Sequence, residues 1–157
     1  MIATQTMKGG AVAVAVLFLM AGCCSPGDKI HGNPPTAMAR SFNATLSGAE
    51  EVPPTNSKGS GLATATLDSD GTFHWDVAYG GLTGPATAAH FHGPAAPGTN
   101  AGVVVNIGGQ GLASPLRGAA HLTEAEIGDL VAGRWYINIH TAANPSGEIR
   151  GQVVPLQ

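Results

Sequence analysis

The stretch from residue 62 to residue 79 reads Leu-Ala-Thr-Ala-Thr-Leu-Asp-Ser-Asp-Gly-Thr-Phe-His-Trp-Asp-Val-Ala-Tyr. Apolar residues dominate Leu62–Leu67, and Phe73, Trp75, Val77 and Tyr79 occupy every second position of the next run, which is the period of a β-strand with one buried face. Asp68-Ser69-Asp70-Gly71 separates the two runs and has a composition typical of a tight turn. The stretch therefore predicts a β-hairpin.

Similar runs continue on both sides of this hairpin. We expect further strands at Phe42–Leu46, Ala86–His92, Val103–Ile107, Leu116–His121, Trp135–His140 and Glu148–Val154. One short helix is expected between two of them, because Thr123 and Glu126 have the spacing of a capping box and Gly133 can end the helix in the left-handed conformation. The prediction is an all-β fold: a single antiparallel β-sandwich or Greek-key barrel of about eight strands with one short helix.

The first 22 residues have the features of an export signal. Lys8 precedes an apolar run, Ala11 to Met20, that is too short to cross a bilayer as a stable helix. The run ends at Met20-Ala21-Gly22-Cys23, which resembles the lipobox of bacterial lipoproteins. We expect removal of residues 1–22 and lipidation of Cys23. An ordinary signal peptide or a plain membrane anchor is the alternative.

The division of the chain follows from this signal. Residues 23–39 contain Pro, Gly and Asn and few large apolar groups, which is typical of a flexible tether. Residues 40–157 are then one β domain, long enough for a single core. We expect it to be extracytoplasmic, anchored to a membrane through the lipid and facing the periplasm or the cell surface.

The net charge and the cysteine content limit the partners and the stabilising bonds that this protein can have. Seven Lys and Arg residues against ten Asp and Glu residues give a net charge of −3, and loss of Lys8 with the signal leaves about −4. This balance argues against a nucleic-acid partner. The cysteines are Cys23 and Cys24 alone, so a lipidated Cys23 excludes an intradomain disulfide. Packing or a metal must then stabilise the domain.

Three histidines are the strongest candidates for chemistry. In a strand, His90 and His92 point to one face while Phe91 points to the other. In a later strand, His140 ends the polar face. If the two strands are close, three imidazoles converge on a site that suits copper better than zinc, since an all-nitrogen site favours Cu(II). The alternative is that all three are partly exposed polar strand residues.

Other polar residues are secondary candidates. Alternation places Arg150 on the Glu148 face of its strand, where it could guide a small anion to the metal; a salt bridge to Glu148 or another acid is the alternative. Asn138 shares the face of His140 and could hydrogen-bond an imidazole. His74 and His121 are weaker candidates for a fourth metal ligand.

The adjacent acids Glu50 and Glu51 are not expected to form a paired acid/base site. Neighbouring residues of an extended chain point to opposite sides, so their carboxylates should not face one substrate. We expect this segment to be the end of a strand and a turn.

Four segments carry a family resemblance. They are Gly-Ala-Glu-Glu-Val-Pro-Pro at 48–54, Thr-Ala-Ala-His-Phe-His-Gly-Pro at 87–94, Gly-Arg-Trp-Tyr-Ile-Asn-Ile-His-Thr at 133–141 and Pro-Ser-Gly-Glu-Ile-Arg-Gly-Gln at 145–152. In order and spacing they resemble the CHRD domain, named for its occurrence in chordin, over about Phe42 to Val154. The chordin setting implies protein binding. The His-x-His pattern with a later histidine is also remotely similar to the site of copper/zinc superoxide dismutases, which implies superoxide as substrate.

The sequence thus predicts an extracytoplasmic, membrane-anchored copper protein that dismutates superoxide at one copper held by His90, His92 and His140, with Arg150 guiding the anion. Two alternatives stay open. The domain could be a non-catalytic interaction module at the cell envelope with a protein partner, or a copper storage or delivery protein that uses the same ligands.

Overall fold

The computed structural model describes residues 39–157. The expected export signal, the lipidation site Cys23 and all but the last residue of the expected tether lie outside the described residues, so those expectations remain predictions. Within residues 39–157, no helix combines the length and the apolar composition that a membrane crossing requires.

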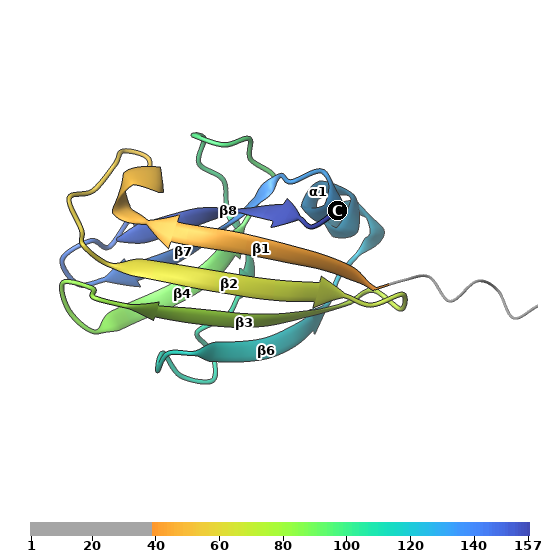
Figure 1. The fold of residues 1–157 in the computed structure, drawn as a ribbon, viewed down its shortest axis with the longest axis horizontal. Coiled ribbons are helices and arrows are strands. Elements are labelled where there is room, and N and C mark those ends of the chain that lie inside the picture. The colour runs from red at the N-terminus through yellow and green to blue at the C-terminus, as the bar shows by residue number, and fades with distance from the viewer. Residues whose placement is uncertain (1–38) are drawn as a thin grey trace, which may run out of the picture. The chain divides into compact units, whose positions relative to one another are not determined.

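The described residues form eight strands and one α-helix. The elements are β1 (Arg40–Ser47), the 3-10 turn η1 (Gly48–Glu50), β2 (Ser60–Leu67), β3 (Thr72–Gly80), β4 (Ala86–His92), β5 (Val103–Asn106), β6 (Leu116–His121), α1 (Glu124–Val131), β7 (Trp135–Thr141) and β8 (Ile149–Pro155). All strands belong to one sheet in the order β5-β4-β7-β8-β1-β2-β3-β6, and every neighbouring pair is antiparallel. Figure 1 shows β1, β2 and β3 side by side.

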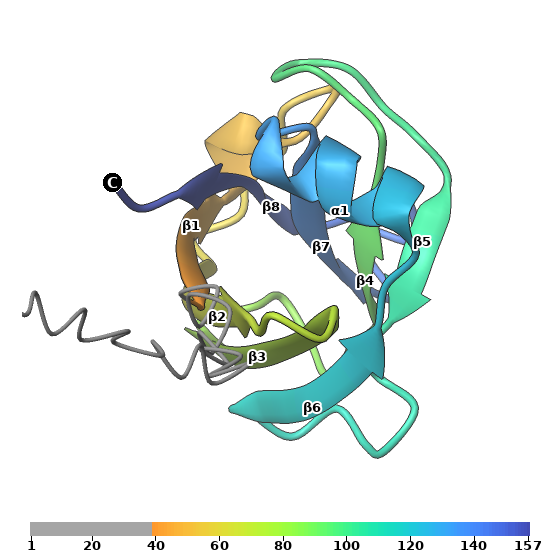
Figure 2. The ribbon, with the colours of Figure 1, turned by 90° about the vertical axis from the view of Figure 1, so that its right-hand side faces the viewer.

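The sheet curls into a nearly closed barrel, as the view along the strands shows (Figure 2). Its two edge strands, β5 and β6, do not pair with each other. The loop between β5 and β6 is tied to β3, because Ser114 Oγ accepts a hydrogen bond of 2.8 Å from the backbone N–H of Tyr79. Helix α1 lies at one end of the barrel (Figure 2). The all-β prediction, with about eight antiparallel strands and one short helix, is confirmed, and the arrangement is a barrel rather than two separate sheets.

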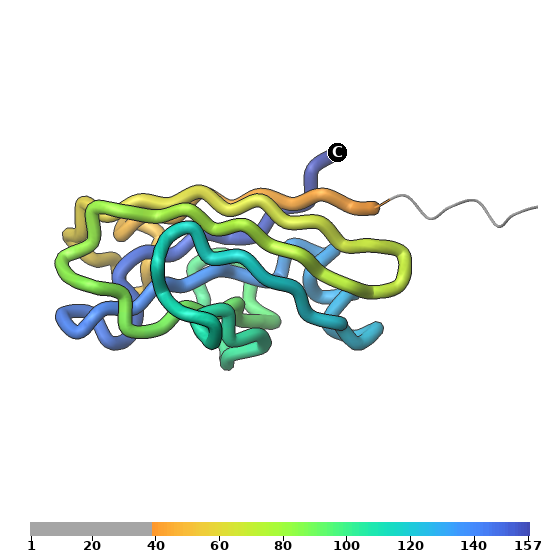
Figure 3. The backbone as a smooth tube through the Cα atoms, turned by 90° about the horizontal axis from the view of Figure 1, so that it is seen from below, coloured from red at the N-terminus to blue at the C-terminus, as the bar shows by residue number. Residues whose placement is uncertain are grey.

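The predicted hairpin is β2–β3, visible in Figure 3 as a long ribbon closed by a tight turn. Leu67 pairs with Phe73 at the turn, and the Asp68 N–H donates to the Thr72 carbonyl at 2.9 Å. Gly71 adopts φ +86°, a left-handed conformation that glycine reaches without steric cost. The turn residues thus fix the register that sends Phe73, Trp75 and Val77 into the barrel.

The helix has the ends that its sequence predicts. The Thr123 side chain accepts from the Glu126 N–H, and the Glu126 carboxylate accepts from the Thr123 N–H, which completes the capping box. Gly133 follows the helix with φ +69°. Most strand ends differ from the expected ends by one or two residues. For example, β5 stops at Asn106 rather than Ile107, because the Asn106 side chain accepts the Gly108 N–H and turns the chain.

Aromatic side chains fill the centre of the barrel. Phe73 is fully buried, and its ring contacts four others: Phe42 at a centroid distance of 6.1 Å, Trp75 at 6.1 Å, Phe91 at 5.2 Å and Trp135 at 5.9 Å. These rings come from β1, β3, β4 and β7. The core therefore joins the β1–β3 side of the barrel to the strands that carry the candidate histidines.

Phe73→Ala should lower the free energy of unfolding by about 3 to 5 kcal/mol, because it removes a buried ring and leaves a cavity among four aromatic neighbours. Denaturant unfolding followed by tryptophan fluorescence measures this loss. Leu62→Ala on the exposed face of β2 is the matched control and should change stability by less than about 0.5 kcal/mol. Equal stabilities of the two variants would contradict the assigned core.

Candidate metal centre

The outer face of β4, β7 and β8 carries several polar side chains that are buried or half-buried. All seven residues of β7 are buried, because the barrel core covers one face and loops cover the other. Across the strands, the register aligns His90 with Asn138 and Arg150. The next row aligns His92 with Tyr136 on the neighbouring strand. Every polar group on this face must therefore find a partner within the protein or in a ligand.

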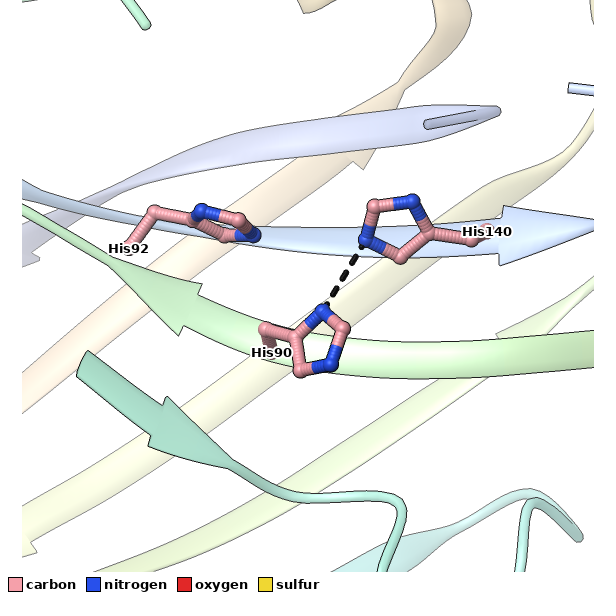
Figure 4. Close-up of side chains that lie close together, drawn as sticks. All are labelled: His90, His92 and His140. Atoms are coloured by element: carbon pink, nitrogen blue, oxygen red, sulfur yellow. Dashed lines mark hydrogen bonds between the residues drawn. The ribbon is translucent and has the colours of Figure 1, made fainter. Parts of the chain in front are cut away.

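His90, His92 and His140 meet on this face, as the sequence predicted (Figure 4). One ring nitrogen from each lies within 4.8 Å of the others. His90 Nδ1 is 3.1 Å from His140 Nε2. The ring centroids are 5.5 Å apart for His90 and His92, and 5.0 Å apart for His90 and His140. His92 and His140 are buried while His90 is half-buried, so the cluster is open towards solvent on the His90 side.

Backbone carbonyls fix the tautomers of the two buried imidazoles. His92 Nδ1 is 3.1 Å from the Ala101 carbonyl, and His140 Nδ1 is 3.0 Å from the Pro145 carbonyl. A carbonyl only accepts, so both Nδ1 atoms carry the proton and both Nε2 atoms are acceptors; that of His140 faces His90 Nδ1 at 3.1 Å. His92 Nε2 is buried without any hydrogen-bond partner. This orphaned acceptor points to a ligand that the cluster would bind.

The donor set fits one transition-metal ion. Two nitrogens that bind the same ion at about 2.0 to 2.1 Å lie roughly 2.9 to 3.4 Å apart when adjacent and about 4.1 Å apart when opposite. The His90–His140 distance of 3.1 Å lies in the first range. The widest separation of 4.8 Å exceeds both values, so a small rotation of the rings must accompany binding. Imidazoles whose other nitrogen is held by a carbonyl are typical metal ligands.

Burial favours the neutral form of all three imidazoles by lowering each pKa, and the neutral form is the one that binds metal. Burial lowers the pKa of His90, and the proximity of His140 adds to this effect. Burial also lowers the pKa of His92, against the opposing effect of its hydrogen bond to Ala101. For His140, burial again lowers the pKa while the Pro145 carbonyl opposes it.

Arg150 lies beside the cluster rather than facing solvent. Only 1% of its surface is exposed, and its guanidinium stacks on the Tyr136 ring, 3.5 Å from the centroid. The same Tyr136 ring also stacks on His92, with centroids 4.8 Å apart and planes at 6°. Arg150 also donates to Asn100 Oδ1 at 2.9 Å and to the Thr99 carbonyl at 2.7 Å. It therefore holds the loop whose Ala101 carbonyl orients His92.

The expected alternative for Arg150, a salt bridge to Glu148, does not form. In residues 39–157, no acid lies within ion-pair distance of Arg150. Glu148 is fully buried and accepts from Ser57 Oγ at 2.6 Å, from the Thr83 N–H at 2.7 Å and from Thr141 Oγ1 at 2.5 Å. Burial alone would raise the pKa of Glu148, but the hydrogen bonds from Ser57, Thr141 and Thr83 lower it to about 2.

Glu51 belongs to this face as well. Glu50 is exposed while Glu51 is only 5% exposed, so the two acids point apart as expected. Glu51 Oε2 accepts a hydrogen bond of 3.2 Å from Asn138 Nδ2. Burial raises the pKa of Glu51 to about 7, although the Arg150 charge and the Asn138 hydrogen bond act in the opposite direction.

The remaining candidates lie elsewhere. Neither His74 nor His121 joins the histidine cluster of the described residues; both are exposed, and His74 Nε2 lies 3.2 Å from Asp68. Asn138 hydrogen-bonds Glu51 rather than an imidazole. Sequence reasoning missed Tyr136 and Glu51. Strand alternation places Tyr136 on the His140 face and could have indicated it, whereas nothing in the pattern indicated that Glu51 reaches β7.

The fold and the cluster define a small all-β domain with a compact three-histidine group on its outer face. The sequence model of the CHRD domain matches residues 42–153, and the chain therefore belongs to the CHRD domain family. No curated protein matches the chain, and no solved structure matches it. The remote similarity to copper/zinc superoxide dismutases thus has no support from these comparisons.

Glu148→Gln tests how firmly the loops around the site are held. The substitution should cost about 2 to 4 kcal/mol at pH 7, because it removes a buried charge that several donors satisfy. A folded pKa of about 2, below the ordinary 4.5, means that this stabilisation is complete above about pH 5 and is lost as the pH falls towards 2. The difference between wild type and variant should shrink over that range in denaturant unfolding. A difference independent of pH would contradict an ionised, satisfied Glu148.

Proposed function

We propose that this protein is an extracytoplasmic copper protein that dismutates superoxide at a single ion held by His90, His92 and His140. The observation that carries the proposal is the unpartnered, buried Nε2 of His92 beside the 3.1 Å contact between His90 and His140. Copper is favoured over zinc because all three donors are imidazole nitrogens, and because both cysteines of the chain, Cys23 and Cys24, precede the domain.

Dismutation converts two superoxide anions and two protons into O₂ and H₂O₂: one anion loses an electron and the other gains it. Bound copper would supply the one-electron redox chemistry, because it is stable as Cu(II) and as Cu(I). The protein supplies three neutral imidazoles held in fixed tautomers and an opening on the half-buried His90 side. A small anion can reach the cluster there, while the loops exclude bulk water from His92 and His140.

Arg150 contributes to this function through its charge and its contacts. Its burial and its hydrogen bonds to Thr99 and Asn100 leave no donor aimed at solvent, so it would not bind superoxide as an exposed clamp. Its positive charge acts on His92, whose pKa it helps to lower after the larger effect of burial. The same field favours an incoming anion.

The proposed location rests on the N-terminal sequence. The apolar run before Cys23 and the Met20-Ala21-Gly22-Cys23 segment support export and lipid attachment. A lipid anchor would hold the domain at the membrane without an apolar face of its own, and a superoxide dismutase there would protect the cell envelope.

The wild-type protein should bind one Cu(II) with nitrogen coupling in its electron paramagnetic resonance spectrum and should accelerate superoxide decay. His90→Ala and His140→Ala should each lose the stoichiometric copper and the turnover together. His74→Ala and His121→Ala, which change exposed histidines outside the cluster, are the matched controls and should keep both. The wild-type rate should fall as ionic strength rises, if the Arg150 charge attracts the anion.

Each other outcome counts against the proposal. Copper bound by the three histidines without turnover would exclude the enzyme and favour storage or delivery. Turnover that persists in metal-free His90→Ala would exclude this cluster as the catalytic centre. Absence of specific copper binding would refute the proposal. The remaining hypothesis for this CHRD domain would then be an interaction module at the cell envelope.

A further inference from the structure

Two buried oxygen atoms near the histidine cluster have no hydrogen-bond partner. They are Oε1 of Glu51 and Oδ1 of Asn138, on side chains that are 5% and 3% exposed. Both atoms lie within 2.6 Å of the point where a Cβ on Gly147 would stand, so they border the same small space. The other two polar atoms of these groups, Glu51 Oε2 and Asn138 Nδ2, are already joined by a 3.2 Å hydrogen bond.

An ionised Glu51 leaves this arrangement unfavourable. A carboxylate oxygen and an amide oxygen are both acceptors, and two buried acceptors that border one space lose their hydration and repel each other. A single proton on Oε1 removes both defects, because the resulting hydroxyl can donate to Asn138 Oδ1. The acid and the amide then form a ring closed by two hydrogen bonds, with every polar atom satisfied.

We propose that Glu51 is protonated in the folded protein and forms a neutral acid–amide pair with Asn138, which positions the turn that orients His140. The raised pKa of Glu51, caused by burial, agrees with the pairing. The charged group that acts on Glu51 is Arg150 on β8, but the Arg150 guanidinium donates to Asn100 and Thr99 rather than to the acid. The titratable imidazoles on the adjoining strands are His90, opposite Asn138 on β4, and His140 on β7.

The pair acts on the cluster through the chain segment 144–147. Gly147 packs so closely on Glu51 and Asn138 that no side chain fits there. Two residues earlier, the Pro145 carbonyl accepts the proton of His140 Nδ1 at 3.0 Å. Loss of the proton from Glu51 would open the ring beneath Gly147 and loosen this carbonyl. Glu51 is thus a positioning residue; this half of the inference rests on the proposed copper site, while the pairing itself does not.

Glu51→Gln separates a neutral pair from an ionised one. A glutamine reproduces the neutral pair permanently, since its oxygen accepts from Asn138 Nδ2 and its NH₂ donates to Oδ1. In wild type, a folded pKa of about 7, raised above the unfolded value, means that stability falls as the pH rises from about 4.5 to 7. We expect Glu51→Gln to match the wild-type Tm at pH 5 and to exceed it by about 5 °C or more at pH 8. Glu50→Gln, at the exposed neighbour, should change neither value.

Three results would overturn the pairing. The first is a Tm of Glu51→Gln below that of wild type at pH 8, which a stabilising ion pair between Glu51 and Arg150 would give. The second is a Tm difference between the two proteins that does not change with pH. The third is a wild-type infrared spectrum at pH 5.5 that shows no protonated-carboxyl band beyond those of Glu51→Gln. At that pH, ordinary exposed carboxyls are mostly ionised.

The positioning role has its own test with Cu(II) as the probe. Glu51→Ala should lower the Cu(II) affinity at least tenfold and broaden the nitrogen hyperfine lines in the electron paramagnetic resonance spectrum. Glu51→Gln should restore the affinity and the line width. Equal affinities in the three proteins would refute the positioning role. Wild type without specific copper would refute the proposed function instead, and the Tm and infrared results would still decide the pairing.

Discussion

Burial of strand β7 on both faces is the constraint on which the rest of this structure depends. Trp135, Ile137 and Ile139 meet the barrel core, while Tyr136, Asn138 and His140 lie beneath loops. A buried polar group without a partner costs free energy, so each outer residue needs a contact from another segment. Tyr136 hydrogen-bonds Ala101, Asn138 hydrogen-bonds Glu51, and His140 hydrogen-bonds the Pro145 carbonyl. These contacts bring the η1 segment, the β4–β5 loop and the β7–β8 turn onto one face.

The same contacts prepare the histidine cluster for a metal. The carbonyls that bind the Nδ1 protons of His92 and His140 leave both Nε2 atoms unprotonated, and the Arg150–Tyr136–His92 stack limits rotation of the His92 ring. A site held by carbonyls and stacked rings loses little conformational entropy when it binds an ion. The unsatisfied His92 Nε2 is the cost of this arrangement in the metal-free protein.

Period-two patterns account for most of what the sequence could predict. Alternation in residues 62–79 and the turn at 68–71 gave the hairpin, and His-Phe-His on β4 with His140 on β7 gave the cluster. The partners of these residues were beyond prediction, because they depend on loop conformations with no periodicity. Arg150 illustrates this: alternation located its strand, but the loop at Thr99 and Asn100, rather than Glu148, supplies its partners. Glu51 reaches Asn138 across 87 residues of sequence, a contact that no local pattern encodes.

A preformed metal centre depends most directly on the tautomers of His92 and His140 in the metal-free protein. Long-range ¹H–¹⁵N NMR of the imidazole rings at neutral pH measures them, because a protonated and an unprotonated ring nitrogen have well-separated shifts. Protonated Nδ1 and unprotonated Nε2 are expected on both rings, so that each Nε2 can bind a metal. Protonated Nε2 on either ring, or rapid exchange between tautomers, would contradict a preformed metal centre.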